Sequence, residues 1–260
     1  MNNSFNGVVI IDKPKGITSF NVVKRVKKLT KAKKVGHTGT LDPLATGVLP
    51  LCLGRSTKLA DFIMKGDKIY KGVIRLGTST DTYDAEGTIT DEKEIPDDLD
   101  LETIRKKAEK FTGRLMQTPP PFSAAKFKGK PLYKFARKGI LIQKEPREVQ
   151  VFSLQLTDYK RPEVFFSIHC SKGTYVRSIA HDLGISLGCL AHLSSLRRVK
   201  SGPFTIDDAI TLGRLEDIFT SKAKLSEKAK LSEKSESDAI LENIFISHDK
   251  LIKIIEKIYN

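Results

Sequence analysis

Apolar residues recur along the chain at two spacings, one typical of strands and the other of helices. The apolar run in residues 7–12 predicts a buried strand, and the Lys-Pro-Lys-Gly sequence after it predicts a loop. After a cap at Thr18 or Ser19, apolar residues at helical spacing predict a helix that exposes several Lys and Arg side chains. In residues 68–77 the apolar spacing changes to two, which places Tyr70 on the same strand face as Ile74.

The rest of the chain continues this mixture of strands and helices. The patterns predict short helices at 56–64 and before Gly139, helices at 100–111 and 174–187, and strands near 149–156, 164–170 and 191–199. Strand pairs with intervening helices predict an α+β fold with a central mixed, mostly antiparallel sheet flanked by helices.

The C-terminal part differs in composition. The six residues AKLSEK occur twice in tandem, at 223–228 and 229–234, with alternating charge and few core-forming side chains. Such a sequence forms either a solvated single helix or a flexible insert, and we favour the insert. We therefore predict a catalytic domain over 1–213, a low-complexity Lys/Ser/Glu insert over 214–238, and a segment over 239–260 that packs on the body.

Charge points to a polyanionic partner. The 45 Lys and Arg exceed the 31 Asp and Glu, which gives a formal net charge of +14 over 260 residues. Nucleic acid is the simplest partner for such a chain, and a membrane surface is the competing one. With no apolar run of 18 residues and no signal-peptide layout at the N-terminus, we expect a cytoplasmic protein without a membrane partner. The basic face of the first helix is then either a solvated surface or part of an RNA track.

The three cysteines predict neither a disulfide framework nor a metal site. Cys52, Cys170 and Cys189 are far apart in the sequence and form no CxxC pair. We expect them to be reduced and mostly buried, and we expect no bound metal.

One carboxylate, Asp42, stands in the glycine-rich stretch GHTGTLDPLATGVLP, residues 36–50. Pro43 disfavours helical geometry for the residue before it, so the Asp42 side chain is expected to project from a loop. Lys33 and Lys34 precede the loop, and an approaching polyanion would meet their positive charge first. By itself such a loop is more often structural, and only its context favours chemistry.

Four segments supply that context: GHTGTLDPLATGVL, YKGVIRLGTSTDTYDAEG, TPPPFSAAKFKGKPLYKFARKG and CSKGTYVRSIAHDLG. In this order they resemble the TruB-type tRNA pseudouridine synthases, and KPKGITS and LSSLRRVKSGPF extend the match over roughly residues 7 to 210. The resemblance implies the pseudouridine synthase fold and conversion of the T-loop uridine at tRNA position 55 to pseudouridine. It also implies base flipping, no metal or organic cofactor, and tRNA, through its T-arm, as the partner of a monomer.

The resemblance implies three catalytic residues. Asp42 matches the catalytic aspartate, which attacks or stabilises an electron-poor ribose carbon or adds to C6 of the ring. Arg177 matches the arginine that pairs with this aspartate and keeps it ionised, although by sequence alone it resembles a surface residue on a helix. Tyr70 matches the tyrosine that stacks on the base and helps to remove the C5 proton, whereas by sequence alone it resembles a core residue.

Further positions are expected to contact substrate. His37 matches a histidine implicated in replacing the flipped nucleotide, Leu196 matches an apolar residue of the base pocket, and Thr38 stands beside His37. In TSTDTYDAEG, Asp84 is the expected substrate-side group and Asp81 the turn former. The basic segment 122–138 is expected to contact the RNA backbone, in particular through Lys126, Lys130 and Tyr133.

Other functions fit the sequence less well. A non-catalytic RNA-binding or RNA-chaperone protein on the same fold would tolerate loss of Asp42, Tyr70 or Arg177, yet all three are present. A phosphate-transferring enzyme would require a P-loop or a cluster of metal-binding carboxylates, which the sequence lacks. Bacterial relatives usually carry a further small RNA-binding domain; we expect a complete PUA-like domain to be absent here. A guide-RNA-dependent synthase normally needs that domain and accessory proteins.

Overall fold

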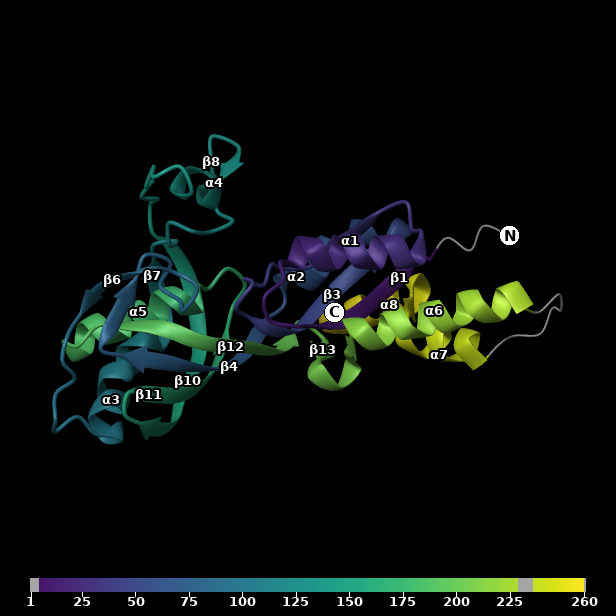
Figure 1. Ribbon diagram of the computed structural model, residues 1–260. Helices are drawn as coiled ribbons and strands as arrows, with labels where there is room; N and C mark the ends of the chain where they lie inside the picture. Colours follow the sequence, from purple (N-terminus) through teal and green to yellow (C-terminus); the bar gives the residue numbers. More distant parts are fainter. Residues whose placement is uncertain (1–4, 229–235, 260) are drawn as a thin grey trace. The chain divides into compact units, whose positions relative to one another are not determined.

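The polypeptide folds into two compact units, and most contacts of each unit lie within that unit. In this computed structural model, residues 5–228 and 236–259 are described (Figure 1). The first unit combines Met1–Gly66 with Arg198–Asn260, and the second is Asp67–Arg197. The first unit contains Asp42, and the second contains Tyr70 and Arg177.

The first unit is built on β1 (Gly7–Lys13) and β3 (Thr46–Leu53), which pair antiparallel along the full length of β1. The parallel strand β14 (Ile210–Thr211) and the antiparallel strand β15 (Ile246–Ser247) both pair with β1. On the other side, β2 (Val35–His37) pairs with β3. The strand β13 (Phe204–Thr205) forms a hairpin with the end of β12 (Ala191–Ser201).

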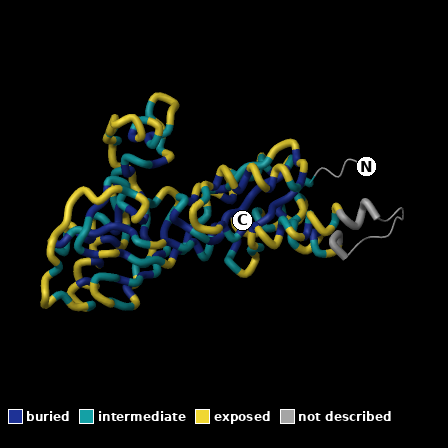
Figure 2. The backbone as a smooth tube through the Cα atoms, viewed as in Figure 1, coloured by how far each residue is buried: buried dark blue, intermediate teal, exposed yellow. Residues whose placement is uncertain are grey.

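Side chains of β1 alternate between two buried faces. Val8 and Ile10 pack with Ile63 of α2 (Ala60–Lys65) and with Leu251 of α8 (His248–Tyr259). The intervening residues Val9 and Ile11 point to the opposite face and are also buried. Figure 2 shows this strand as a buried part of the unit. The 3-10 helix η1 (Gly54–Leu59) joins β3 to α2, and η3 (Ile206–Asp208) follows β13.

Helix α1 (Ser19–Thr30) begins where the sequence predicts it. The Thr18 side chain caps the helix by accepting a hydrogen bond from the Asn21 amide, and Lys31 ends it in a left-handed conformation. Its buried residues include Val22, Val23 and Val26. The helices α6 (Leu212–Lys228) and α7 (Glu236–Ile244) complete the unit.

The second unit is an antiparallel sheet in the order β12-β4-β11-β10-β7. Its strands are β4 (Lys68–Leu76), β7 (Gly113–Gln117), β10 (Arg147–Lys160), β11 (Glu163–Cys170) and the first part of β12. Helix α3 (Leu101–Ala108), extended by η2 (Glu109–Phe111), packs on β10 and on α5 (Val176–Leu187). Two small hairpins and a short helix lie outside this sheet: β5 (Thr78–Thr80) with β6 (Ile89–Glu92), β8 (Lys126–Phe127) with β9 (Lys130–Pro131), and α4 (Leu132–Ala136).

The α+β class and the mixed, mostly antiparallel pairing are confirmed. Helix α5 is followed by Gly188 in a left-handed conformation, as its sequence predicts. Of the two alternatives for the AKLSEK repeat, a helix or the favoured flexible insert, the first copy follows the helical one, because the backbone of α6 continues to Lys228. The second copy, 229–234, lies outside the described residues.

Gly184 tests the packing of α5 against the chain that leads into β12. A Cβ at Gly184 would lie 2.2 Å from the Ala191 amide nitrogen, whereas a Cβ at Gly213 of α6 would meet nothing within 4 Å. We expect Gly184→Ala to lower the free energy of unfolding by about 2 kcal/mol or more, because backbone must move. The matched Gly213→Ala should be neutral or stabilising by up to about 1 kcal/mol. Urea unfolding measures both, and equal stabilities would contradict the close packing.

Candidate active site

The Asp42 loop connects β2 to β3 in the first unit. Asp42 is half-buried, and its carbonyl accepts a hydrogen bond from the Ala45 amide at 3.1 Å, which closes a tight turn. The next carbonyl, that of Pro43, accepts from the Gly16 amide at 2.8 Å. The loop expected from the sequence is therefore present, and its backbone is bonded to the Lys-Pro-Lys-Gly loop.

Lys13, the last residue of β1, anchors both loops. Its side chain is 0% exposed, and the ammonium group donates to the carbonyls of Pro14 at 2.9 Å, Ile17 at 2.8 Å and Pro43 at 3.3 Å. A buried cation is tolerated only when such partners replace its water. Lys13 thus holds the residue that follows Asp42.

Ser19, the first residue of α1, holds the residue that precedes Asp42. Its hydroxyl donates to the Leu41 carbonyl at 2.9 Å and accepts from the Leu41 amide at 2.8 Å. Both backbone groups of Leu41 are satisfied by one side chain, which fixes the path of the chain at this point.

Arg198 fixes the first part of this loop and the strand β3 that follows it. Only 1% exposed, it donates from Nε to the Val48 carbonyl at 2.7 Å and from Nη2 to the Gly39 carbonyl at 3.1 Å. The planar guanidinium donates in two directions at once, which an ammonium group cannot do with fixed geometry. Lys13, Ser19 and Arg198 together bond the Asp42 loop to three other segments of its unit.

His37 and Thr38 lie at the start of this loop. Burial, with a smaller contribution from the Arg198 charge, lowers the pKa of His37 below its usual 6.5, so the ring is neutral at pH 7. Thr38 is fully buried, and its amide and hydroxyl both donate to the Pro50 carbonyl. This placement suits support of the loop better than the substrate contact expected of Thr38.

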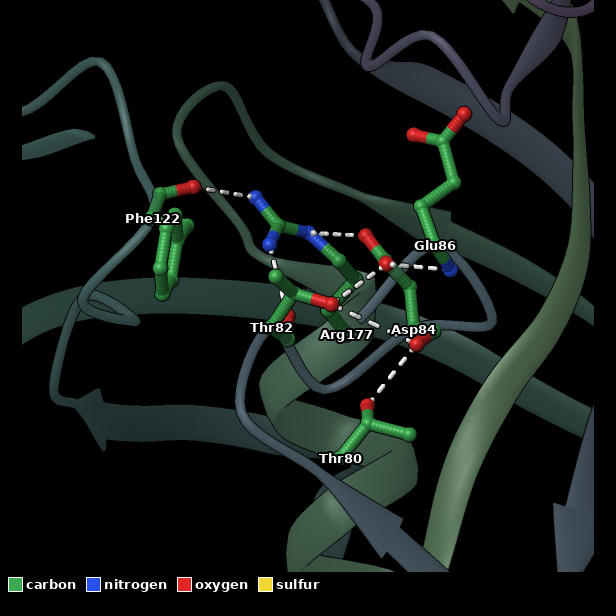
Figure 3. Close-up of polar contacts among 6 residues, drawn as sticks. All are labelled: Thr80, Thr82, Asp84, Glu86, Phe122 and Arg177. Carbon is green, nitrogen blue, oxygen red and sulfur yellow. Dashed lines mark hydrogen bonds and ion pairs between the residues drawn. The ribbon is translucent and has the colours of Figure 1, made fainter. Parts of the chain in front are cut away.

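Arg177 and Asp84 form a buried ion pair in the second unit (Figure 3). The Arg177 Nε lies 3.5 Å from Asp84 Oδ2, and both side chains are 5% exposed. Arg177 also donates to the carbonyls of Thr82 at 2.7 Å and Phe122 at 2.9 Å. The guanidinium therefore joins helix α5 to two loops, and it is not the surface residue that its position on the first turn of a helix indicates.

The TSTDTYDAEG loop is ordered by its own aspartates. Asp84 accepts from the Thr82 hydroxyl at 2.6 Å and from the Glu86 amide at 3.0 Å. Asp81 accepts from the Thr88 amide at 2.9 Å, which agrees with its expected role as turn former. Asp84 is buried in its ion pair with Arg177. The expected role of Asp84 as a group that contacts the substrate stays a prediction.

A second contact joins this loop to α5 one helical turn beyond Arg177. The rings of Tyr83 and His181 are stacked with centroids 3.8 Å apart and an angle of 9° between their planes. Tyr83 adopts a positive φ of 62°, a conformation that is uncommon for a bulky side chain. The stacking compensates for part of this backbone strain and holds the residue next to Asp84.

The remaining expected residues lie in the same unit. Tyr70 in β4 and Leu196 in β12 are each 9% exposed, so both are largely buried. Lys126 and Lys130 are exposed on the β8–β9 hairpin, as a contact to RNA requires. Tyr133 is partly buried, and the Arg137 guanidinium lies 5.5 Å from its ring centroid.

Three anchoring residues, Lys13, Ser19 and Arg198, were not among the predicted site residues, and Ser19 was expected only as a possible helix cap. Arg198 lies two positions after Leu196 in the same strand. Because side chains alternate along a strand, both residues lie on the same face, and this spacing could have indicated Arg198 from the sequence. Lys13 ends an apolar run, where a lysine normally marks the edge of the buried strand. Its burial follows from the two loops that meet around it.

The cysteines are buried, as expected, and separate. Burial raises the pKa of Cys52 to about 12 and that of Cys170 to about 11, so both thiols are protonated at neutral pH. Within the described parts of the chain, no helix is long and apolar enough to cross a membrane.

Known proteins resemble this chain over most of its length. The family model described as TruB family pseudouridylate synthase (N terminal domain) matches residues 27–176, and that for the tRNA pseudouridylate synthase B C-terminal domain matches 177–250. A relative from Syntrophotalea carbinolica named tRNA pseudouridine synthase B is 46% identical over 81% of this chain and 69% of its own. One of the same name from Solibacter usitatus is 49% identical over 82% and 72%.

A solved chain of a Cbf5-Nop10-Gar1 complex has a TM-score of 0.70 and 28% identity. The match covers 95% of this chain and 62% of the solved one, so this chain spans less than two thirds of that relative. The fold is the pseudouridine synthase fold. The chain belongs to the TruB family of pseudouridylate synthases.

Replacing Lys13 by methionine should loosen the Asp42 loop. The substitution leaves buried carbonyls without their donor, so we expect the free energy of unfolding to fall by about 2 to 4 kcal/mol. Lys15, exposed two residues further on, offers the control: Lys15→Met should change stability by less than about 0.5 kcal/mol. Chemical denaturation measures both variants. Similar losses would mean that the Lys13 hydrogen bonds do not stabilise the loop.

The lowered pKa of His37 predicts a pH dependence of stability. Because the unfolded chain binds the His37 proton more readily than the folded chain, stability falls as pH decreases below 6.5. His37→Gln should make this fall less steep as the pH decreases below 6.5. Thermal unfolding at several pH values measures the slope. An NMR titration that places the His37 pKa above 6.5 would contradict the assignment.

Proposed function

We propose that this protein isomerises the T-loop uridine at position 55 of tRNA to pseudouridine, with Asp42 as the catalytic carboxylate. As a member of the TruB family whose relatives are named tRNA pseudouridine synthase B, it is a tRNA pseudouridine synthase, an isomerase. The position of the uridine and the roles of individual residues are proposals that rest on the family motifs and on the geometry of each unit.

The observation that carries the assignment of Asp42 is the anchoring of its loop. Lys13, Ser19 and Arg198 hold the backbone on both sides of a half-buried carboxylate. Such preorganisation costs hydrogen-bonding groups and buried charge that a plain connecting loop does not need, and it suits a group that must meet a substrate in one geometry.

The reaction needs a carboxylate of this kind. The N1–C1′ bond breaks, the uracil turns over, a C5–C1′ bond forms, C5 loses a proton and N1 gains one. Asp42 assists by adding to C1′ or to C6 of the ring, and both routes need an ionised carboxylate. Either addition is reversed before release, so the enzyme returns unchanged.

Other residues are proposed to bind the flipped base and its surroundings. Arg177 supplies a positive charge that its buried bonds hold in place, and Tyr70 stacks on the base and helps to remove the C5 proton. His37, neutral at pH 7, replaces the flipped nucleotide in its stack, and Leu196 lines the base pocket.

The T-arm is proposed to lie along the basic hairpin of Lys126 and Lys130, with Tyr133 at its base. We infer a cytoplasmic enzyme that acts as a monomer. No observation on the described residues favours the non-catalytic RNA-binding alternative.

Replacing Asp42 by asparagine should abolish pseudouridine formation while RNA binding persists. The amide keeps the shape but cannot act as a nucleophile or anion, so we expect a rate loss of more than about a thousandfold. The substrate is an unmodified T-arm hairpin, and carbodiimide mapping detects the product. Asp61→Asn, which removes an exposed carboxylate from the same unit, should keep the wild-type rate. Appreciable turnover by Asp42→Asn would exclude Asp42 as the essential group.

A further inference from the structure

Helix α1 lies in the most one-sidedly charged part of the chain. Residues 13–41 contain nine Lys or Arg and no Asp or Glu. Helix α3 differs, because residues 100–110 combine four basic with three acidic side chains. Mixed charges are usual on a solvated helix, so the one-sided charge of α1 requires another explanation.

Three exposed lysines of α1 and one exposed aromatic ring form a stripe, which we define as Phe20, Lys24, Lys27 and Lys28. At about 100° per residue these four positions fall within roughly 100° of one another around the helix. All four are exposed. The neighbouring Arg25 points elsewhere and pairs with Glu216 of α6 at 3.7 Å. Among the side chains that the structure describes, none is an acidic partner of the three lysines in the stripe.

Phe20 gives the stripe an aromatic end. Its side chain is 60% exposed, and Lys24 Nζ lies 4.8 Å from its ring centroid. Exposed aromatic rings among cations are the usual platform for bases of single-stranded nucleic acid, since one face stacks while the cations contact phosphates. An isolated exposed ring would offer no such combination.

The stripe begins beside the catalytic loop. Ser19, the residue before Phe20, bonds both backbone groups of Leu41, which precedes Asp42. From Phe20 to Lys28 the helix rises by about 12 Å, enough for its lysines to contact more than one phosphate of a strand. A strand whose target base reaches Asp42 would therefore meet cations as it continues along α1.

We propose that this stripe binds the sugar-phosphate backbone of the substrate RNA next to the target uridine, with Phe20 stacking on an unpaired base. The proposal rests on the proposed function for the identity of the RNA. An anionic membrane is disfavoured, because the apolar side of α1 (Val22, Val23 and Val26) is buried in the unit and cannot enter lipid.

The test compares two triple variants of equal charge change. K24Q/K27Q/K28Q removes the lysines of the stripe, and K106Q/K107Q/K110Q removes three exposed lysines around α3. Binding of an unmodified tRNA transcript is measured by fluorescence anisotropy between low and moderate salt. For the stripe variant we expect at least about tenfold weaker binding at low salt and a loss of about 2 in the slope of log affinity against log salt. The α3 variant should show neither change.

A single Phe20→Ala variant isolates the stacking contribution, and it should weaken binding about fivefold with an unchanged salt slope. Thermal unfolding checks that all variants are folded. Binding is measured without turnover, so failure of the proposed chemistry would leave this readout intact. Equal losses in both triple variants, or an unchanged slope in the stripe variant, would overturn the proposal. So would loss of binding to phosphatidylserine vesicles without any loss of binding to RNA.

Discussion

Close backbone packing at Gly47, the second residue of β3, fixes the strand that follows the Asp42 loop. Gly47 pairs with Lys13 in the β1–β3 register, and a Cβ on it would lie 2.2 Å from the Arg198 carbonyl oxygen. With φ at 100° the residue also adopts a conformation that side chains disfavour. Only glycine allows the backbone of Arg198 to approach β3 this closely, and this approach brings the Arg198 side chain to the loop that Lys13 also holds.

The two cations hold this loop through carbonyl groups. Lys13 donates to three carbonyls, and Arg198 donates to two. Desolvating a charge is expensive, and hydrogen bonds offset only part of the cost. Their effect is therefore better understood as specificity of loop geometry than as added stability. Removing either cation leaves buried carbonyls unsatisfied, and the loop would have to move to rehydrate them.

The second unit fixes its arginine by a different principle. Arg177 has a carboxylate partner as well as two carbonyls, and the Asp84 carboxylate is itself bonded to Thr82 and Glu86. A network in which each member is satisfied is stiffer than isolated pairs. Figure 3 shows that its members come from α5 and from two loops, so the network also determines the path of those loops.

The sequence predicts the local features well because their causes are local. Thr18 caps α1, Gly188 follows α5, and Pro43 keeps Asp42 out of a helix, each through the conformation of a few neighbouring residues. The burial of Arg177 has no local cause. It depends on Asp84 and Phe122, which are far away in the sequence, and only long-range contacts bring them together.

Helix α1 combines structural roles and a proposed RNA-binding role on different faces. Its valines face the core, Ser19 at its first turn holds Leu41, and its basic stripe faces solvent. These roles belong to different sides of one helix. A change in the charge of the solvent-facing side would therefore not disturb the Asp42 loop. The core and Ser19 have no such freedom, because a shift of the helix along its axis would displace Leu41 and, with it, the carboxylate of the next residue.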